Sequence, residues 1–145
     1  MTTVDDFDQA VEQVQLALGE FLNGNPEPWQ NLWSHREDVT LANPLGPPTR
    51  GWEQVAQILE RASKSFIRDG EITSFEPVAK YVTPELAYIV WIEQTKGKVG
   101  EREDITPFAL RVTTLFRPED GVWKVVHRHA DPITTAQPAE SVIQE

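Results

Sequence analysis

Cysteine is missing from this chain of 145 residues. Without thiols the chain forms no disulfide framework, no thiolate metal site and no thiol-based catalytic centre. A chain with no cysteine at all suits a reducing compartment, and we therefore expect a cytoplasmic protein.

Positive charge and long apolar runs are also scarce. The chain has 13 Lys and Arg residues against 23 Asp and Glu residues, which gives a formal net charge of −10. Proteins bind nucleic acids and anionic membranes by neutralising phosphates with clustered Lys and Arg, so we expect neither partner. No stretch approaches the roughly 18 apolar residues of a membrane span, and the start of the chain lacks the features of an export signal. We expect a soluble protein that is not exported.

Helical spacing dominates the first part of the chain. The chain as a whole has 39% hydrophobic and 25% charged residues, which is typical of one globular domain. From Val4 to Leu22 apolar residues recur at spacings of three and four, which predicts an amphipathic helix. Pro26 predicts the start of a short second helix that runs past Trp29. The helical spacing returns over residues 51–65 and predicts a third helix.

After Gly70, β-branched and aromatic runs alternate with turn signals. The predicted strands cover residues 72–82, 86–95, 105–116 and 122–130, with breaks at 83–85, 96–98 and 118–121. A short strand at 39–43 precedes them and ends in the proline-rich turn 44–48. Three helices ahead of an antiparallel meander predict an α+β fold in which helices cover one face of a sheet. We assign residues 1–131 to one domain and 132–145 to a C-terminal extension.

Local patterns carry a resemblance to a known superfamily. They lie in Glu37–Gly46, Arg50–Val55, and Arg111–Thr113 running into Gly121–His129. In these patterns the chain resembles the SnoaL-like, or nuclear transport factor 2-like, superfamily, which includes ketosteroid isomerases, limonene epoxide hydrolases, polyketide cyclases and the association domain of calmodulin-dependent kinase. The resemblance implies a cone-shaped, curved antiparallel sheet that encloses a pocket with three N-terminal helices. It implies no single activity, because this scaffold hosts enzymes, binding proteins and assembly modules.

The resemblance also shows which catalytic groups are absent. Asn43 stands where ketosteroid isomerases carry the proton-shuttling Asp, and Thr113 stands where they carry the oxyanion-binding acid. An amide does not carry protons at neutral pH, so we expect no steroid isomerisation. Asn43 and Arg111 match limonene epoxide hydrolases, but the water-activating acids of those enzymes fall at Thr113 and Arg128. Epoxide hydrolysis is therefore not expected, and no cofactor or metal is implied.

Both family comparisons predict which side chains line the pocket. They turn Asn43, Arg111, Thr113 and Arg128 inward. Pairing across the hairpin at 118–121 then sets Arg111 beside Arg128 and Thr113 beside Val126. Two adjacent guanidinium groups favour an anionic ligand between them. Tyr88 and Glu93 have opposite parity on one strand, and the isomerase register favours Tyr88 as the inward residue. The predicted ligand-binding residues are Trp33, Asn43, Trp52, Tyr88, Arg111, Thr113, Arg128 and His129.

The opposite packing is the alternative, because the other face of the last two strands is the more hydrophobic one. It carries Leu110, Val112, Phe116, Trp123 and Val125. If that face packs on the helices, His127 and His129 become the pocket residues. These two histidines could bind a metal only with a third ligand from elsewhere, and packing or a hydrogen bond is the default interpretation.

We therefore predict a pocket for a small, partly apolar and anionic molecule. If the protein is an enzyme, isomerase, cyclase or lyase chemistry by proton transfer is the expected class, with Asp38 and Asp131 as the acids to test. The alternative is a non-enzymatic dimerisation or ligand-sensing module. If the arginines face inward, Phe116 and Trp123 remain on an exposed apolar patch, which predicts a homodimer through the sheet.

Overall fold

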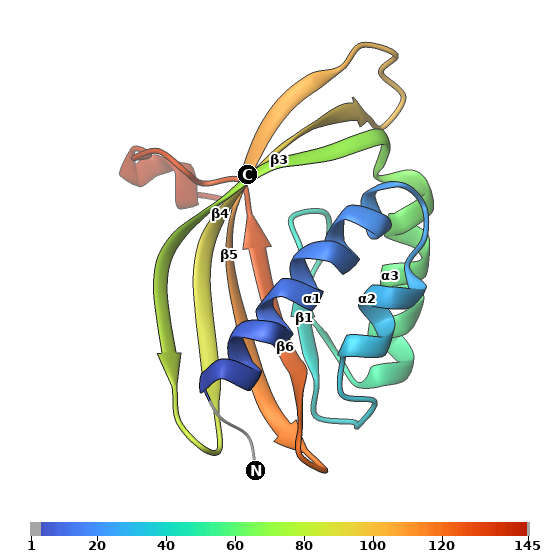
Figure 1. Cartoon of the computed structure of the whole chain (residues 1–145). Helices are drawn as coiled ribbons and strands as arrows, with labels where there is room; N and C mark the ends of the chain where they lie inside the picture. Colours follow the sequence, from blue (N-terminus) through green and yellow to red (C-terminus); the bar gives the residue numbers. More distant parts are fainter. Residues whose placement is uncertain (1–3, 145) are drawn as a thin grey trace.

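Three helices cover one face of the sheet in the structure, a computed structural model that describes residues 4–144 (Figure 1). They are α1 (Val4–Leu22), α2 (Glu27–Leu32) and α3 (Trp52–Ser65). The predicted helices are confirmed, with α2 beginning directly after Pro26. Residues 1–3 of the predicted domain and residue 145 of the predicted extension lie outside the described part. Within that part, no helix has both the length and the apolarity needed to cross a membrane.

The sheet is mixed, curved and unclosed. Its strands are β1 (Thr40–Ala42), β2 (Thr49–Arg50), β3 (Ile67–Val82), β4 (Ala87–Val99), β5 (Thr106–Glu119) and β6 (Val122–Asp131). They lie in the order β2-β1-β6-β5-β4-β3. The predicted antiparallel meander is confirmed for β3 to β6. The sheet also contains one parallel pair, between β1 and β6, which makes it mixed. A short 3₁₀ helix, Ala139–Val142, follows the last strand.

The predicted break at residues 96–98 does not occur, because β4 runs on to Val99. Gly97 does not form the predicted turn; it allows close packing against Ile67. A Cβ atom at this position would lie 2.5 Å from Cδ1 of Ile67. Glycine is therefore required here because β3 approaches β4 closely, not because the chain reverses.

The aromatic face of β5 and β6 packs on the helices. Phe7 of α1 meets the ring of Phe116 edge-on at 4.9 Å and that of Trp123 at 5.3 Å. Both sheet residues are buried, as is Val125 beside them. The outward position that the resemblance predicts for these side chains is wrong, and the alternative packing is right for this part of the sheet. We call the face that contacts the helices the inner face, and the opposite one the outer face.

A β-bulge in β6 changes which side chains face inward. Phe116 pairs with Val125, whereas the preceding Leu115 pairs with His127, so Val126 is an extra residue. Such a bulge breaks the alternation of side chains. Val125 and Arg128 are consequently both buried on the inner face, although regular alternation would separate them.

The predicted cross-strand pairs are also wrong, because the hairpin closes with Glu119 paired to Val122, two residues from the predicted register, and the bulge shifts the pairing by one residue more. Thr113 pairs with His129 rather than Val126, and Arg111 pairs with Asp131 rather than Arg128. No pair of neighbouring arginines forms there, and the reason given for an anionic ligand between them disappears.

Candidate functional site

A cavity lies between the helices and the inner face of the sheet. Its walls are mostly apolar and include Leu18, Phe21, Leu22, Leu59, Ala62 and Leu110. The space that the centres of water-sized molecules can reach is about 70 Å³, which is several times the volume needed for one water. Four polar side chains also line it: Asn43, Glu93, Thr95 and Arg128. A concave apolar site with a few polar groups is the usual form of a small-molecule pocket.

A buried ion pair crosses this cavity. Arg128 donates from Nη1 to Oε1 of Glu93 at 2.9 Å and from Nη2 to Oε2 at 3.1 Å. The two side chains are only 10% and 5% exposed. Trp91 donates a third hydrogen bond, from Nε1 to Oε1 of Glu93, at 3.0 Å. The carboxylate is therefore fixed by three donors, and it in turn fixes the guanidinium.

Arg128 keeps donors to spare. A guanidinium has five N–H groups, of which the bidentate pair uses two. Its central carbon lies 5.9 Å from the centre of the Trp29 ring, close enough for a cation–π contact. Burying an ion pair costs desolvation free energy that a well-packed apolar pair would avoid. The buried pair is therefore not explained by its contribution to stability alone.

Asn43 shapes the rim of the pocket. Its side-chain oxygen accepts a hydrogen bond from the backbone N–H of Leu45 at 3.1 Å, which fixes the turn after β1. Leu45 also lines the cavity, although its side chain is largely exposed. On another side, the rings of Phe66 and Phe108 pack edge to face at 5.7 Å. Leu45, Phe66 and Phe108 therefore add apolar, only partly covered side chains to the cavity lining.

The structure brings two of the eight predicted ligand-binding residues, Asn43 and Arg128, into the pocket lining. Trp33 is fully buried and packs edge-on against Trp29, inside the core rather than on the cavity wall. Trp52 is partly buried and stacks on the ring of His35 at 4.1 Å.

The other four predicted residues, Tyr88, Arg111, Thr113 and His129, lie on the outer face, because their strand positions alternate with buried inner-face residues. Tyr88 stacks on Tyr81 at 5.7 Å. Asp131 accepts hydrogen bonds from Nε of Arg111 at 2.6 Å and from His129 at 3.0 Å. Burial raises the pKa of Asp131, but these bonds and one from the backbone of Ile133 outweigh it, so the pKa is lowered overall.

His127 also lies on the outer side of the bulge. Its Nδ1 is 2.7 Å from the hydroxyl of Thr40. Burial, and secondarily the neighbouring His129, lower the pKa of His127. The alternative prediction that both histidines line the pocket is wrong, since neither is part of its lining. Among residues 4–144 no three side chains of His, Asp or Glu gather closely enough to hold a metal ion.

With this geometry established, comparison with known proteins assigns the family. A sequence model of the SnoaL-like domain matches residues 12–134. The chain belongs to the SnoaL-like family. No curated protein matches this SnoaL-like chain in sequence.

Solved structures share the fold of this SnoaL-like domain at low sequence identity. A nuclear transport factor 2-like superfamily protein from Salmonella enterica serovar Typhimurium gives a TM-score of 0.75 at 14% identity, with 94% of each chain covered. A ketosteroid isomerase-like protein from Erwinia carotovora atroseptica gives 0.72 at 15%, covering 88% of this chain and 94% of that one. A candidate calcium/calmodulin-dependent protein kinase type II association domain from Thiobacillus denitrificans gives 0.72 at 18%, with the same coverage. The likeness establishes the fold alone.

Glu93 is the pocket residue of this SnoaL-like domain that the sequence prediction passed over in favour of Tyr88. A signal for it is present in the strand. Ile89, Trp91 and Glu93 occupy every second position of β4, so they share one side of the strand, and all three are buried. Following the large apolar residues of β4, rather than the isomerase register, would have turned Glu93 inward.

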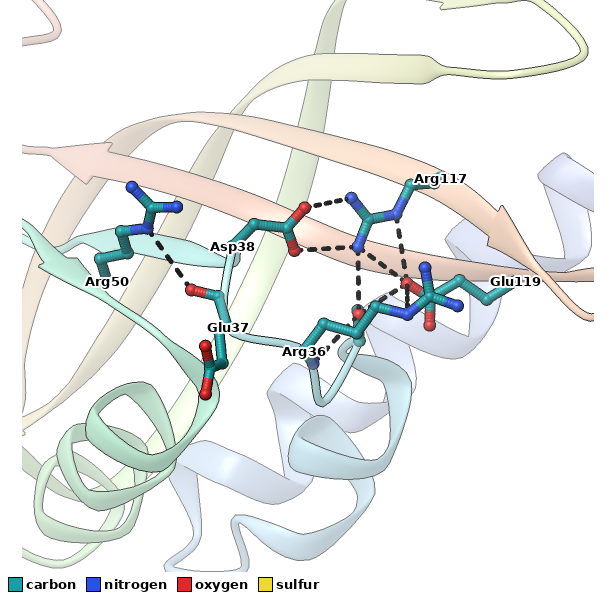
Figure 2. A network of polar contacts seen from close by, with 7 residues as sticks. Arg36, Glu37, Asp38, Arg50, Arg117 and Glu119 are labelled. Atoms are coloured by element: carbon teal, nitrogen blue, oxygen red, sulfur yellow. Dashed lines mark hydrogen bonds and ion pairs between the residues drawn. The ribbon is translucent and has the colours of Figure 1, made fainter.

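A second group of charged residues lies apart from the pocket, where β5 meets the loop before β1 (Figure 2). Arg117 donates from Nη1 to Asp38 at 2.7 Å and from Nη2 to Glu119 at 2.8 Å. The buried hydroxyl of Ser34 donates to Glu119 at 2.6 Å, and Nε of Arg36 lies 3.5 Å from the same carboxylate. We call these five residues the Arg117 cluster. Asp38 and Asp131, the two acids singled out for catalysis, do not line the pocket.

Hydrogen bonds in the Arg117 cluster favour the charged forms of its members. The bond from Arg117 lowers the pKa of Asp38. Burial raises the pKa of Glu119, but the bonds from Ser34 and Arg117 outweigh it and lower the pKa overall. Bonds to Asp38 and Glu119 raise the pKa of Arg117. Each charged group of the cluster is paired with another of its members, which is typical of a cluster that stabilises the fold.

Proposed function

We propose that this protein binds a small, mostly apolar molecule in the pocket and holds an oxygen atom of that molecule on Arg128. The observation that carries the proposal is the buried guanidinium that Glu93 fixes inside an otherwise apolar cavity, with N–H donors left over. A ligand carbonyl or hydroxyl oxygen would accept from those donors while its hydrocarbon part contacts the walls.

The ion pair favours a neutral ligand over an anionic one. The sequence prediction of an anion depended on an unpaired Arg111 and Arg128 side by side. In the structure Glu93 already neutralises Arg128, and Arg111 is on the outer face with Asp131. A bound carboxylate would place a second negative charge next to Glu93 in a site with little water, which is unfavourable.

Calorimetric titration with three probes of similar size tests this proposal. Cyclohexanone has an acceptor oxygen, cyclohexane has none, and cyclohexanecarboxylate is charged. We expect cyclohexanone to bind most tightly, because it satisfies Arg128 without adding charge. Tighter binding of the carboxylate would contradict the neutral-ligand proposal, and equal binding of cyclohexane would contradict the role of Arg128.

Two variants locate the binding. The double variant Glu93→Leu/Arg128→Met replaces the ion pair by apolar side chains of similar size, which proteins often tolerate. It should bind cyclohexanone no better than cyclohexane. Arg111→Met removes an arginine from the outer face and is the matched control, which should bind all three probes as the wild type does.

A proton-transfer enzyme is the second candidate function. Glu93 is a carboxylate within the pocket, and a structural neighbour is described as ketosteroid isomerase-like. Glu93 would be the proton acceptor and Arg128 the donor to the developing oxyanion. The test is hydrogen–deuterium exchange at the carbon next to the carbonyl of bound cyclohexanone, followed by NMR. Exchange that is lost in Glu93→Gln would support this candidate, and exchange at the uncatalysed rate would argue for binding alone.

We also propose that two copies associate through the outer face. Phe116 and Trp123, the residues that suggested a dimer from sequence, are buried under α1 and cannot form the interface. The outer face instead exposes the stacked rings of Tyr81 and Tyr88, and a neighbour is described as a candidate association domain. Light scattering should give a dimer mass that Tyr88→Asp reduces. A monomer at high micromolar concentration would refute the proposal.

A further inference from the structure

Thr95 is a polar residue without a partner in the pocket wall. Its side chain lines the cavity from β4, and the residue is only 4% exposed. Within residues 4–144, no hydrogen bond joins its hydroxyl to another group. Buried hydroxyls are normally paired, because leaving one unpaired costs free energy. Valine has the same shape and would complete an apolar wall without that cost.

The hydroxyl of Thr95 differs from the polar atoms of the described residues that are fully enclosed without a partner, because it is not one of those enclosed atoms. The hydroxyl of Thr114 and the indole nitrogens of Trp33 and Trp123 are sealed within the protein, and none of these residues lines the cavity. Thr95 alone among these four faces the space that a ligand would occupy. A ligand group can therefore pair with it.

Thr95 and the ion pair form two polar positions along one line. Glu93 and Thr95 are two residues apart on the same side of β4, which separates their Cβ atoms by about 7 Å. Across the sheet, Glu93 pairs with Leu110 and Thr95 pairs with Phe108, so apolar side chains flank both positions. Phe108 packs against Phe66 and both are only partly buried, whereas Leu110 beside Glu93 is buried, so Thr95 lies nearer the surface than Glu93.

We infer that the pocket takes a neutral ligand with two polar ends: a compact ring that carries one oxygen on Arg128 and a second oxygen, on the opposite side of the ring, on Thr95. The inference rests on the proposed function and narrows it to a substrate class. A cyclic hydrocarbon bearing a ketone and a hydroxyl across the ring presents two such oxygens on opposite sides. The hydroxyl of Thr95 both donates and accepts, so it pairs with a ligand hydroxyl or a carbonyl.

Titration with a matched pair of probes tests the inference. Cyclohexanone offers one oxygen, and 4-hydroxycyclohexanone offers a second one across the same ring. We expect the hydroxyketone to bind the wild-type protein about five- to tenfold more tightly, as one extra neutral hydrogen bond in a buried site allows. Thr95→Val should abolish that advantage and leave cyclohexanone binding unchanged, whereas Thr95→Ser should retain the advantage.

Thr113→Val is the control, because it makes the same change on the outer face of the neighbouring strand and should retain the full advantage. Equal binding of the two probes to the wild type would overturn the inference, as would an advantage that survives in Thr95→Val. If cyclohexanone still binds in a manner that depends on Arg128, the proposed function stands and only the second polar contact is refuted. Failure of both probes to bind would overturn both proposals.

Discussion

Two arginines on neighbouring strands make similar hydrogen bonds in contrasting surroundings. Arg117 is bound by Asp38 and Glu119 near the β5–β6 hairpin, where water reaches part of each side chain. Arg128 is bound by Glu93 alone, inside the cavity and almost out of contact with water. The first arginine joins a loop to a hairpin, whereas the second lies in the cavity wall with N–H groups that Glu93 does not use. The two arginines differ in burial and in unused donors rather than in the ion pair itself, and these two properties are the reason that the proposed function assigns the ligand to Arg128.

The largest expected effect comes from breaking the buried pair on one side. Arg128→Met leaves Glu93 charged and without its main partner in the core. We expect the free energy of unfolding to fall by about 3–5 kcal/mol, as measured by urea denaturation. The double variant Glu93→Leu/Arg128→Met should recover most of that loss, because it removes both charges. A single variant as stable as the double one would show that the pocket admits more water than the structure indicates.

Arg117→Met should have a smaller effect. It removes the bonds to Asp38 and Glu119, but Glu119 keeps its bonds to Ser34 and Arg36 and some contact with water. We expect a loss of about 2 kcal/mol in the same denaturation experiment, with ligand binding unchanged. A larger loss than that of Arg128→Met would reverse the comparison between the two arginines.

The pH dependence of the unfolding free energy should report the two carboxylates of the Arg117 cluster. Glu119 and Asp38 have pKa values below their ordinary 4.5 and 3.8, so the folded state holds fewer protons than the unfolded state in this range. Their contribution to stability is complete above the unfolded values and is lost as the pH falls through the lowered folded values. The unfolding free energy of the wild type should therefore decline below about pH 5.

Arg117→Met is the variant that checks this assignment. Its loss of stability relative to the wild type should be full at neutral pH and should shrink as the medium is acidified. Arg111→Met leaves Asp38 and Glu119 untouched, so its curve should keep the contribution of the cluster. A difference between wild type and Arg117→Met that stays constant from neutral pH into acid would disprove the role assigned to the two carboxylates.

The smallest effect is expected on the outer face. The side chain of Arg111 is about half exposed, and its bond to Asp131 is a surface ion pair. Such pairs contribute about 0–1 kcal/mol, so Arg111→Met should barely change the urea midpoint. A loss comparable to that of Arg117→Met would indicate that the outer face is covered, for example by a second copy.

The fold could be predicted from sequence because its signals are local and repeated. The spacing of apolar residues in α1 and α3, and the proline before α2, indicate three helices without reference to distant residues. The family patterns around Asn43 and after Arg111 then point to the arrangement of the sheet. The parallel pairing of β1 with β6 had no such signal, since it joins segments far apart in the chain.

The pocket lining was harder to predict because one extra residue in β6 decides which of the following side chains face the cavity. Regular alternation through β6 would place His127 and His129 on the side of Val125, whereas the bulge at Val126 places Arg128 there. The composition of that segment does not predict the bulge. The inward position of Glu93, the partner of Arg128, does not follow from the isomerase register, which favours Tyr88. It follows from the alternation of buried residues along β4.

The bulge in β6 decides which side chains the strand presents to the cavity without any change of sequence. In an unbulged strand of the same composition, two imidazoles would reach the cavity and the guanidinium would not. Straightening the strand without changing its sequence would therefore exchange a permanently charged donor for two imidazoles, whereas deleting Val126 would remove the bulge and keep Arg128 on the side of Val125. An alignment that places a gap on the wrong side of this position misassigns the pocket residues of a relative. A graft of this site onto another protein has to reproduce the inward position of Arg128 relative to Val125.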